Sequence, residues 1–457
     1  MAERYHLIGV GGAGMSALAE LLRARGHDVS GSDQRDSAAL ARLRDLGVRV
    51  YLGHDPAQVP ATGSVVVSTA VRPDNPELVR AHELGRPVLH RSVALARAAA
   101  GQDFVAVAGA HGKTTTSAML AVALRAAGQD PSYAIGGTVL ALGTGAHLGT
   151  GRAFVAEADE SDGSFLAYRP RVAVVTNVEP DHLDHYGSAA ALARAFEDFA
   201  GRVVPGGLLV AGADDPGALA LARHAAAAGT RVRTYGTGPA PADLPHLAVR
   251  DVVLTGAGAT ARLGPDGVPL ALRVGGEHMV RNAAAAWCAG VELGVAPAAM
   301  ATALGSFTGT GRRFETRGTA AGVRVVDDYA HHPTEIAATL AAARLVAGPG
   351  RVLVLFQPHL YSRTQAFAAE FAAALSAADA AVVTDVYAAR EDPVPGVDGS
   401  LVTAAMEPGR GRYVADKVAA ARAVADDARP GDLVLTVGAG DVTELGAVIL
   451  DRLRERA

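Results

Sequence analysis

The sequence has 457 residues, of which 49% are hydrophobic and 19% are charged, and its formal net charge is -5. This length allows two to four domains, and the balanced charge argues against a nucleic-acid partner, which requires a concentrated basic face. No basic-then-apolar leader and no apolar run of the roughly 20 residues needed to cross a bilayer is visible, so we expect a cytoplasmic protein without a membrane partner. The single cysteine, Cys288, fits a reducing compartment and is expected to pack inside a helix.

Short β-rich apolar runs alternate with Ala/Leu/Arg segments at helical spacing along the chain. This alternation predicts βαβ units and an α/β fold built on parallel sheets. In chain order, strands are expected near residues 6–11, 28–33, 48–53, 64–70, 104–109, 154–159, 171–177, 208–214, 323–330, 351–358, 380–388 and 432–440. Residues 236–272 are rich in glycine and proline and are expected to form loops or a small β excursion. Boundaries between three blocks are placed near residues 100 and 312.

A glycine-rich loop, GVGGAG (9–14), follows the first expected strand, and Asp33 lies about twenty residues later. Such a loop binds a diphosphate with backbone N–H groups at the start of the next helix, here expected over residues 15–26. Ser32 and Asp33 could hydrogen-bond either a ribose or a base. Taken alone, the loop indicates a nucleotide diphosphate and does not choose NAD over a UDP-sugar.

The second block contains GAHGKTTT (109–116), which lies between an expected buried strand and a helix. Its glycines allow backbone N–H groups to close on phosphate oxygens, Lys113 would neutralise the β- and γ-phosphates, and the Thr114 hydroxyl could bind Mg²⁺. The usual Walker pattern has a glycine where this chain has Val107, so the loop is a shorter variant. We predict that it binds nucleotide phosphates, and an ordinary βα turn is the alternative.

Two polar segments follow later strands of the same block, EADESD (157–162) and TNVEPDHLDHYG (176–187). Carboxylates at the carboxyl ends of strands in an ATP-binding sheet are natural Mg²⁺ ligands, so the acidic segment predicts a metal site. A solvated acidic loop is the alternative. The second segment offers Glu179, Asp181, His182, Asp184 and His185, and histidine among carboxylates could bind a metal or phosphate. His182 taken alone is more often a hydrogen-bonded loop residue.

The third block carries DDYAHHPTE (327–335) and FQPHLYSRT (356–364), each after an expected strand, so their polar residues should gather at one sheet edge. The run Pro333-Thr334-Glu335 predicts the start of a helix. The candidates for holding a carboxylate are His331, His332, His359 and Arg363. Before this block, the paired arginines of FTGTGRRFE (307–315) could reach a phosphate or form a surface salt bridge.

The ordered set of motifs resembles the Mur ligase family over essentially the whole chain. The set comprises GVGGAGMS, GAHGKTTT, EADESD, TNVEPDHLDHY, EHMVRN, GTGRRFE, DDYAHHPTE, FQPHLYSRT and DVYAAREDP. The phosphate loop is shared across the family, whereas GVGGAGMS, DDYAHHPTE and FQPHLYSRT point to the branch that joins L-alanine to UDP-N-acetylmuramate. The resemblance implies a Rossmann-like UDP-sugar-binding domain (1–100), a P-loop ATPase-like central domain (101–311) and a Rossmann-like amino-acid-binding domain (312–457).

The implied reaction belongs to peptidoglycan precursor synthesis in the cytoplasm. ATP phosphorylates the muramyl carboxylate, and the alanine amine then attacks the acyl phosphate, so ATP and Mg²⁺ are the implied cofactors. Small-molecule substrates are the expected partners, without nucleic acid or membrane, and the chain is expected to be a monomer or a weak homodimer.

The resemblance also implies roles for individual residues. Those at the UDP-sugar are Gly11, Gly12, Gly14, Met15, Ser16 and Asp33. Those at ATP are Gly109, Ala110, His111, Gly112, Lys113, Thr114, Thr115, His278, Asn282 and Arg313. The metal is assigned to Thr114, Glu157 and His182, and alanine to His331, His359 and Arg363. The catalytic candidates are Lys113, Glu157, His182, Arg313 and His331. No motif names the base that takes the amine proton, for which His331 and His332 are both candidates.

Three positions depart from the family pattern. Ala110 replaces a usual threonine, which should matter little because the backbone holds the phosphate. Met279 replaces a common asparagine beside the expected adenine contacts, and Leu360 replaces a frequent arginine, which leaves more of the carboxylate-binding role to Arg363. Three other functions stay open: a sister ligase that attaches a recycled peptide to the same UDP-sugar, an NAD-dependent oxidoreductase, and a non-catalytic ATP-binding module.

Overall fold

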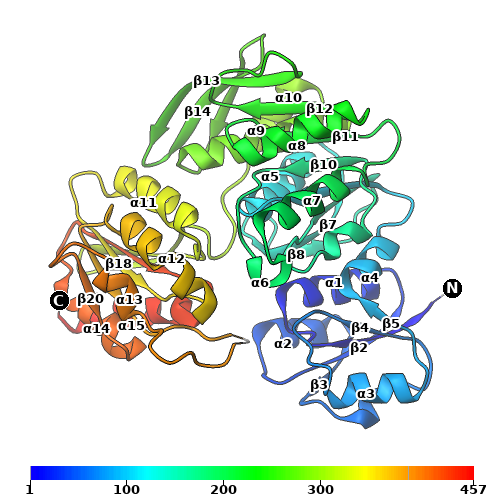
Figure 1. Ribbon diagram of the computed structural model, residues 1–457, viewed down its shortest axis with the longest axis horizontal. Coiled ribbons are helices and arrows are strands. Elements are labelled where there is room, and N and C mark those ends of the chain that lie inside the picture. Colours follow the sequence, from blue (N-terminus) through cyan, green and yellow to red (C-terminus); the bar gives the residue numbers. More distant parts are fainter. Residues whose placement is uncertain (1, 390, 457) are drawn as a thin grey trace. The chain divides into compact units, whose positions relative to one another are not determined.

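Three β-sheets follow one another along the chain, with five, ten and six strands. The computed structural model (Figure 1) describes residues 2–389 and 391–456, so Arg390 of the last motif lies outside the described residues, as do the side chains of residues 183 and 184. The predicted α/β class, with three parts built on mostly parallel sheets, is confirmed. The exact boundaries at residues 100 and 311 stay predictions.

The chain folds into two compact units. The first comprises residues 1–251, 261–271 and 281–307, and the second comprises residues 252–260, 272–280 and 308–457. Among the helices of the described residues, none has both the length and the apolar character that a membrane crossing demands.

The first sheet consists of five parallel strands in the order β3-β2-β1-β4-β5. The strands are β1 (Arg4–Ile8), β2 (Asp28–Asp33), β3 (Arg49–Leu52), β4 (Ser64–Val67) and β5 (Val88–His90). The helices are α1 (Ala13–Ala24), α2 (Ala38–Asp45), α3 (Pro76–Glu83) and α4 (Arg91–Ala98). The strand order reverses beside β1, and ligands bind at the carboxyl ends of parallel strands at such a point. The glycine loop after β1 therefore begins where a nucleotide is expected.

The second sheet has the order β15-β14-β13-β12-β11-β10-β6-β9-β7-β8. Its strands are β6 (Asp103–Ala108), β7 (Ser132–Val139), β8 (Thr144–His147), β9 (Ala153–Glu157), β10 (Val172–Val175), β11 (Leu208–Gly212), β12 (Arg231–Gly236), β13 (His246–Thr255), β14 (Gly258–Leu263) and β15 (Val268–Leu272). Its helices are α5 (Lys113–Ala126), α6 (Leu183–Tyr186), α7 (Ala189–Ala200), α8 (Pro216–Ala227), α9 (Glu277–Glu292) and α10 (Pro297–Leu304). Strands β13 to β15 confirm the expected small β excursion, and the antiparallel β7–β8 hairpin was not predicted.

Strand β6 lies between β9 and β10, and all three run parallel. Val107 is level with Glu157 on β9, and Ala108 is level with Val175 on β10. Consequently the loops that leave these three strands, which carry GAHGKTTT, EADESD and TNVEPDHLDHYG, emerge at one edge of the sheet. Cys288 is fully buried in α9, and burial raises the pKa of its thiol to about 12, which confirms a packing position.

The third sheet has the order β16-β17-β21-β18-β19-β20, with β16 antiparallel to β17. Its strands are β16 (Glu315–Ala320), β17 (Val323–Asp328), β18 (Val352–Phe356), β19 (Ala380–Val383), β20 (Gly411–Tyr413) and β21 (Leu433–Val437). Its helices are α11 (Pro333–Ala347), α12 (Tyr361–Leu375), α13 (Ser400–Ala404), α14 (Lys417–Asp427) and α15 (Leu445–Glu455). Val354 and Phe356 of β18 pack with residues of α11 and α12, whereas Leu353 and Leu355 pack with residues of α14 and α15. Helices therefore cover both faces of this sheet, which accounts for its largely apolar strands.

Candidate active site

The loop of residues 109–112 joins β6 to α5 and has the form of a phosphate-binding loop. Gly112 precedes the helix with a φ of 83°, in the left-handed region that favours glycine. A Cβ atom on Gly109 would lie 2.2 Å from Thr176 Oγ1, so no side chain fits there. The loop therefore approaches β10 closely and leads directly to the N-terminus of a 14-residue helix, the arrangement that binds anions.

Two residues after β10 fix the loop through the backbone of His111. Asn177 accepts a hydrogen bond from the His111 N–H at 2.9 Å and donates one to the His111 carbonyl at 3.1 Å. Thr176 Oγ1 donates to the same carbonyl at 2.5 Å. The sequence analysis did not select Asn177, although its place directly after a strand beside β6 was a usable signal. Both residues act here as supports of the loop.

Lys113 points back over the loop. Its ammonium donates to the carbonyls of Gly109 at 2.6 Å and Ala110 at 3.2 Å, and to Glu160 Oε1 at 2.8 Å. The Lys113 side chain is 17% exposed and that of Glu160 is 2% exposed. Burial acts to lower the pKa of Lys113, but the carboxylates of Glu160 and Asp159 outweigh it and raise that pKa above its usual value. Lys113 is thus a held cation at the mouth of the loop.

Glu157 and Glu160, in the acidic segment 157–162, face the phosphate loop. Glu157 Oε2 accepts from the Thr114 hydroxyl at 2.9 Å, and its Oε1 accepts from the Gly136 N–H at 2.6 Å. Glu160 accepts from Lys113. The first two residues of α5, Lys113 and Thr114, are therefore each hydrogen-bonded to one carboxylate of this segment.

Asp159 and Asp162 instead bind residues of the first sheet's region. Asp159 Oδ2 accepts from Arg91 at the start of α4 at 2.5 Å. Asp162 Oδ2 accepts from Thr69 Oγ1 at 3.0 Å and lies 3.4 Å from His90 Nε2. Although burial opposes it, hydrogen bonding by His90 holds the pKa of Asp162 well below its usual range. The acidic segment is thus not a single metal-binding cluster, because its four carboxylates take separate partners.

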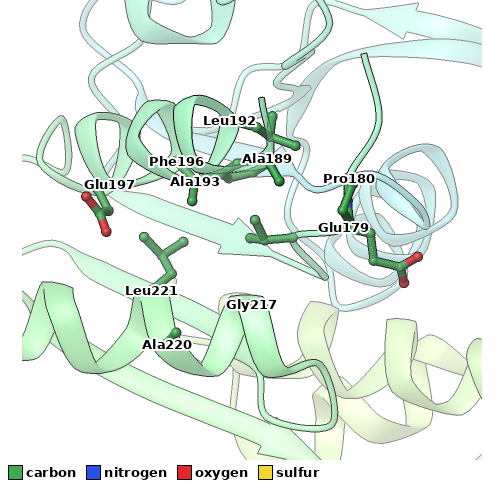
Figure 2. A pocket seen from close by; sticks show the side chains of 11 residues that line it. Glu179, Pro180, Ala189, Leu192, Ala193, Phe196, Glu197, Gly217, Ala220 and Leu221 are labelled. Carbon is green, nitrogen blue, oxygen red and sulfur yellow. The ribbon is translucent and has the colours of Figure 1, made fainter. Parts of the chain in front are cut away.

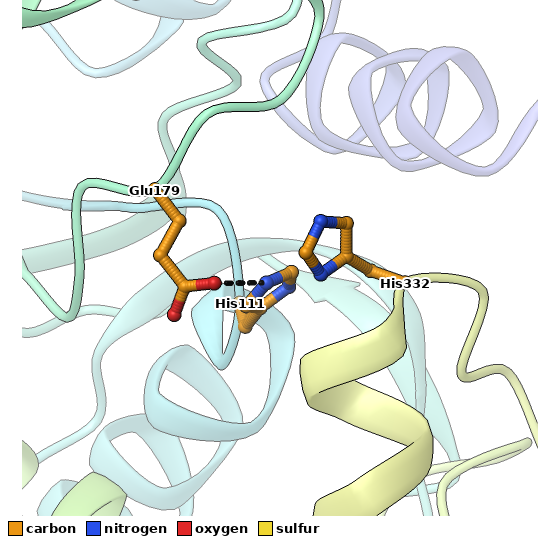
Figure 3. Close-up of side chains that lie close together, drawn as sticks. All are labelled: His111, Glu179 and His332. Atoms are coloured by element: carbon orange, nitrogen blue, oxygen red, sulfur yellow. Dashed lines mark ion pairs between the residues drawn. The ribbon is translucent and has the colours of Figure 1, made fainter. Parts of the chain in front are cut away.

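His182 lies beside Glu160 and Asp181, with its Nε2 3.7 Å from Glu160 Oε1 and 3.5 Å from Asp181 Oδ2. The predicted metal residues therefore form two groups in this structure. Thr114 and Glu157 contact each other, whereas His182 contacts Glu160, which also binds Lys113. His111 Nε2 lies 3.5 Å from Glu179 Oε2, which links the loop to the segment after β10 (Figure 3).

Three further residues predicted to contact the nucleotide, Asn282, Thr115 and His278, lie outside the phosphate loop in different surroundings. A Cβ atom on Gly112 would lie 2.7 Å from Asn282 Oδ1, so the Asn282 side chain on α9 lies against the phosphate loop. Thr115 is buried in α5, which leaves its backbone as the group that a nucleotide could reach. His278, one turn before Asn282, belongs to the second unit, where its ring lies 2.6 Å from a Cβ atom built on Gly276.

The N-terminal glycine loop packs against the end of β2. The Gly11 N–H donates to Asp33 Oδ2 at 2.9 Å, so Asp33 lies beside the loop, and its role toward a ribose or base stays a prediction. A Cβ atom on Gly14 would lie 2.7 Å from Arg91 Nη1, so the start of α1 also lies against Arg91.

Three residues at the start of α1 make local contacts. Gly12 is the N-cap residue of this helix and donates its N–H to the Gly9 carbonyl at 3.2 Å. Ser16 Oγ donates to the Ala13 carbonyl at 3.1 Å. Met15 is a core residue, 4% exposed, so only its backbone is placed to face a substrate.

In the second unit, His331 follows β17 and lies beside Glu335 on α11. Its Nδ1 is 3.1 Å from the Tyr329 carbonyl and 3.3 Å from Glu335 Oε2. Because both neighbours accept hydrogen bonds, Nδ1 carries the proton and Nε2 keeps its lone pair. Burial lowers the pKa of His331 to about 3, although Glu335 opposes this shift. His331 is therefore a neutral imidazole at neutral pH.

The other predicted residues of this unit surround His331. Arg313 Nη1 lies 3.3 Å from Glu335 Oε1, an ion pair that is largely buried rather than the surface salt bridge considered from the sequence, and contact with a phosphate stays a prediction. The rings of His331 and His359 meet edge to face with centroids 6.0 Å apart. Arg363 is buried at the start of α12, and its charge contributes to the low pKa of His331. The structure thus gathers His331, His359, Arg313 and Arg363.

His332 and Asp328 have different surroundings. His332 is the N-cap residue of α11, accepting from the Thr334 N–H at 3.4 Å, and its ring packs on Phe367. This contact gives His332 a structural role at the start of α11, and its role as a second candidate for the base stays a prediction. Asp328 is buried and accepts from the N–H groups of Phe314 at 2.7 Å and Ala330 at 2.8 Å. Burial raises the pKa of Asp328 to about 6.

A small hollow lies between α7 and α8 in the first unit (Figure 2). Its volume is about 150 Å³ and its floor is apolar. Its lining consists of Val178, Glu179, Pro180, Ala189, Leu192, Ala193, Phe196, Glu197, Gly217, Ala220 and Leu221. Of the residues predicted at the site, only Glu179, a candidate for binding a metal or phosphate, is among them. Glu179, on its rim, is the residue that pairs with His111 of the phosphate loop.

Comparisons with known proteins agree with this arrangement. Three segments match models of one family: "Mur ligase family, catalytic domain" over residues 4–103, "Mur ligase middle domain" over residues 107–290, and "Mur ligase, glutamate ligase domain" over residues 312–440. The UDP-N-acetylmuramate–L-alanine ligase of Kineococcus radiotolerans is 60% identical over 460 residues, covering 99% of this chain and 97% of the relative.

Two solved structures are similar over nearly the full length. The UDP-N-acetylmuramate-alanine ligase MurC of Thermotoga maritima has a TM-score of 0.83 and 29% identity, with 100% of both chains covered. The murein peptide ligase of Psychrobacter arcticus has a TM-score of 0.72 and 25% identity, with 99% of both chains covered. The sequence motifs, the three sheets and these similarities agree, and the chain belongs to the Mur ligase family.

Proposed function

We propose that this protein joins L-alanine to the carboxylate of UDP-N-acetylmuramate and converts ATP to ADP and phosphate. The name of the relative that is 60% identical supports this substrate pair, as does the high similarity to the Thermotoga maritima structure. A role in peptidoglycan precursor synthesis and a cytoplasmic location are part of the proposal. The expected monomer or weak homodimer stays a prediction.

The arrangement of Lys113 is the observation that carries the proposal. A carboxylate does not react with an amine because oxide is a poor leaving group, so one of its oxygens must first be phosphorylated. Phosphorylation brings the anionic carboxylate against the anionic γ-phosphate, and a held cation offsets that repulsion. Lys113 is held over the phosphate loop by Gly109, Ala110 and Glu160, which suits it for this role.

The residues beside the loop fit a magnesium ion. Thr114 Oγ1 and Glu157 Oε2 lie 2.9 Å apart and are hard oxygen donors of the kind that Mg²⁺ prefers. Both would hold the ion, which when bound supplies positive charge for the phosphate oxygens. His182 fits this ion less well, since its imidazole is a softer ligand and lies beside Glu160 and Asp181.

His331 is suited to orient the amino acid. Its Nδ1–H faces two acceptors, the Tyr329 carbonyl and Glu335. Nε2 therefore keeps its lone pair and can accept a hydrogen bond from an ammonium group. With a pKa of about 3, His331 is a weak base, so it holds the amine rather than taking its proton. Arg363, whose charge acts on the same imidazole, would bind the amino-acid carboxylate.

The first sheet offers the second substrate a separate site. The glycine loop at the reversal of strand order, with Asp33 hydrogen-bonded to Gly11, suits a nucleotide diphosphate. Family membership favours a UDP-sugar over NAD at this loop. Arg91 connects this loop to the acidic segment, since it contacts both Gly14 and Asp159.

The test is phosphate release from ATP in the presence of UDP-N-acetylmuramate, with and without free L-alanine. We expect release that requires both the sugar and L-alanine, with a new amide product confirmed by mass spectrometry. Release that requires the sugar and a peptide but ignores L-alanine would assign the chain to the peptide-attaching branch. ATP binding without any amino-acid-stimulated release would leave only a binding module.

A further inference from the structure

We propose that Arg312 is a positioning residue for the amino-acid site. It fixes the loop of residues 438–440, which lies between the two loops that carry the site, and it holds Arg313 in place through the ring of Tyr329. The inference rests on the proposed function, because it gives Arg312 a role in the same reaction.

The sheet order places the loop 438–440 in the middle of the site. Strand β21 lies between β17 and β18, and Val437 at its end is level with both Asp328 and Phe356. The Gly438 N–H donates to the Asp328 carbonyl at 3.0 Å, and the Gln357 N–H donates to the Val437 carbonyl at 3.0 Å. The loop after β21 therefore separates the loop with His331 from the loop with His359.

The guanidinium of Arg312 binds this loop at three successive carbonyls. Nη2 donates to Gly438 O at 2.8 Å and to Gly440 O at 3.1 Å, and Nη1 donates to Ala439 O at 3.4 Å. The planar guanidinium of an arginine carries several N–H donors in fixed directions and can bind all three carbonyls, whereas a lysine offers one compact ammonium group. The shape of the loop thus depends on an arginine at this position.

The same guanidinium neutralises a buried carboxylate that ties down both sides of the loop. Asp327 is fully buried, and its Oδ2 lies 3.3 Å from Arg312 Nε. Its two oxygens accept from Thr436 Oγ1, before the loop, and from Thr443 Oγ1, after the loop, each at 2.7 Å. Arg312 therefore restrains the loop directly and through Asp327.

The backbone around Arg312 has an unusual conformation that these contacts maintain. Arg312 and Phe314 have φ values of 59° and 51°, in the left-handed region that favours glycine and is strained for other residues. The Arg312 N–H donates to Glu315 Oε2 at 2.8 Å, and the Arg312 carbonyl accepts from the Tyr329 N–H at 2.7 Å. Such strain persists where the surroundings over-determine it and clusters at functional sites.

Tyr329 connects the two arginines. The guanidinium carbon of Arg312 lies 4.9 Å from the centroid of the Tyr329 ring, and that of Arg313 lies 5.1 Å from it. Both distances are within the range of cation–π attraction. Arg313 also pairs with Glu335, which in turn contacts His331. Moving Arg312 would therefore release one support of the ring on which Arg313 rests.

The test combines a double-mutant cycle with hydrogen exchange on the full-length protein. Arg312→Lys, Arg313→Lys and the double variant are compared with wild type, and Arg317→Lys serves as the matched control. Arg317 is an exposed arginine of β16 that pairs with Glu315 and does not belong to the site. We measure kcat, KM for ATP and for L-alanine, and amide exchange over residues 438–442.

We expect Arg312→Lys to lower kcat by roughly ten- to a hundredfold, since a misplacement of about 1 Å can cost that much, with KM for ATP nearly unchanged. In the Arg313→Lys background the same change should lower kcat less than it does in wild type, because part of its effect passes through Arg313, and amides of residues 438–442 should exchange faster in every variant that carries Arg312→Lys. Unchanged kcat, fully multiplicative effects, or unchanged exchange would each overturn the proposal. A wild-type protein without ligase activity would refute the proposed function, while the exchange measurement would still decide whether Arg312 fixes the loop.

Discussion

Replacing Lys113 with methionine should affect stability and catalysis in separable ways. The change removes the ammonium that lies 2.8 Å from Glu160 Oε1 and leaves a carboxylate whose side chain is 2% exposed. Breaking a buried ion pair by removing one partner typically costs about 3–5 kcal/mol, because the remaining charge is buried without compensation. The variant should therefore be less stable than wild type, although it keeps the fold.

Protonation of Glu160 limits this cost and makes it depend on pH. Holding a carboxyl with an ordinary pKa of ~4.3 in its neutral form costs ~1.4 kcal/mol per pH unit above that value, which is ~3.7 kcal/mol at pH 7 and ~1 kcal/mol at pH 5. Burial raises the pKa of Glu160 even beside Lys113, and loss of that cation should raise it further in the folded variant. The stability deficit should therefore grow as pH rises from 5 to 7.

Catalysis should fail even where stability recovers. Loss of one donor that stabilises the transition state typically costs 10²–10³ in kcat, or about 2.7–4 kcal/mol of barrier. The double variant Lys113→Met/Glu160→Gln removes the buried charge and should regain most of the stability, but it should not regain ligation. Urea unfolding at pH 5 and pH 7 and phosphate release with both substrates measure the two effects. A stability deficit that does not change with pH, or ligation near the wild-type rate in either variant, would refute this reasoning.

Three further changes test other parts of the site. Asn177→Ala removes two hydrogen bonds with the His111 backbone, so ATP affinity measured by calorimetry should fall by roughly tenfold or more, and an unchanged affinity would contradict the support role. Glu157→Gln removes a charge beside Thr114 and should raise the Mg²⁺ concentration for half-maximal activity by about tenfold or more, whereas an unchanged metal dependence would exclude Glu157 as a ligand. His331 has its pKa lowered to about 3, so the unfolded state binds an extra proton between pH ~6.5 and that value, and wild-type stability should fall as pH falls through this window. His331→Gln should remove that part of the slope in urea unfolding, and an identical slope in both proteins would contradict a neutral imidazole in the folded state.

The fold was predictable where strands are buried on both faces. Strands β6, β18 and β21 are continuous apolar runs, and the sequence placed each within a few residues of its observed bounds. The missed elements lack such runs. Strand β7 contains Gly136 and Gly137 and is partly exposed, and the edge strand β16 is largely exposed and polar. Sequence periodicity reports burial, so strands at the margins of a sheet give little signal.

Adjacent identical residues show where sequence reasoning about the site reaches its limit. His331 and His332 are neighbours, yet the first keeps a neutral ring beside Glu335 while the second caps α11. Arg312 and Arg313 differ in the same way, because the left-handed backbone at Arg312 lets its side chain reach the 438–440 loop while Arg313 pairs with Glu335. The motif gives the residue types at the site, but the backbone turn and the start of a helix decide which side chain has which role.

The charges around the phosphate loop explain why a nucleotide site needs so many acids as well as a lysine. Lys113 is the cation of the loop, and Glu160 and Glu157 contribute two negative charges in contact with the first two residues of α5. A triphosphate that enters here meets carboxylates as well as Lys113, so its binding requires further positive charge. A divalent cation between Thr114, Glu157 and the phosphates would supply that charge and remove the repulsion from Glu157.

Glu160 keeps Lys113 ionised and directed at the loop before the nucleotide binds. The same carboxylate lies 3.7 Å from His182 Nε2, which is a second group that can share its charge when Lys113 contacts a phosphate. We therefore expect the acidic segment to make ATP binding depend on a divalent cation, which would keep nucleotide alone from saturating the loop.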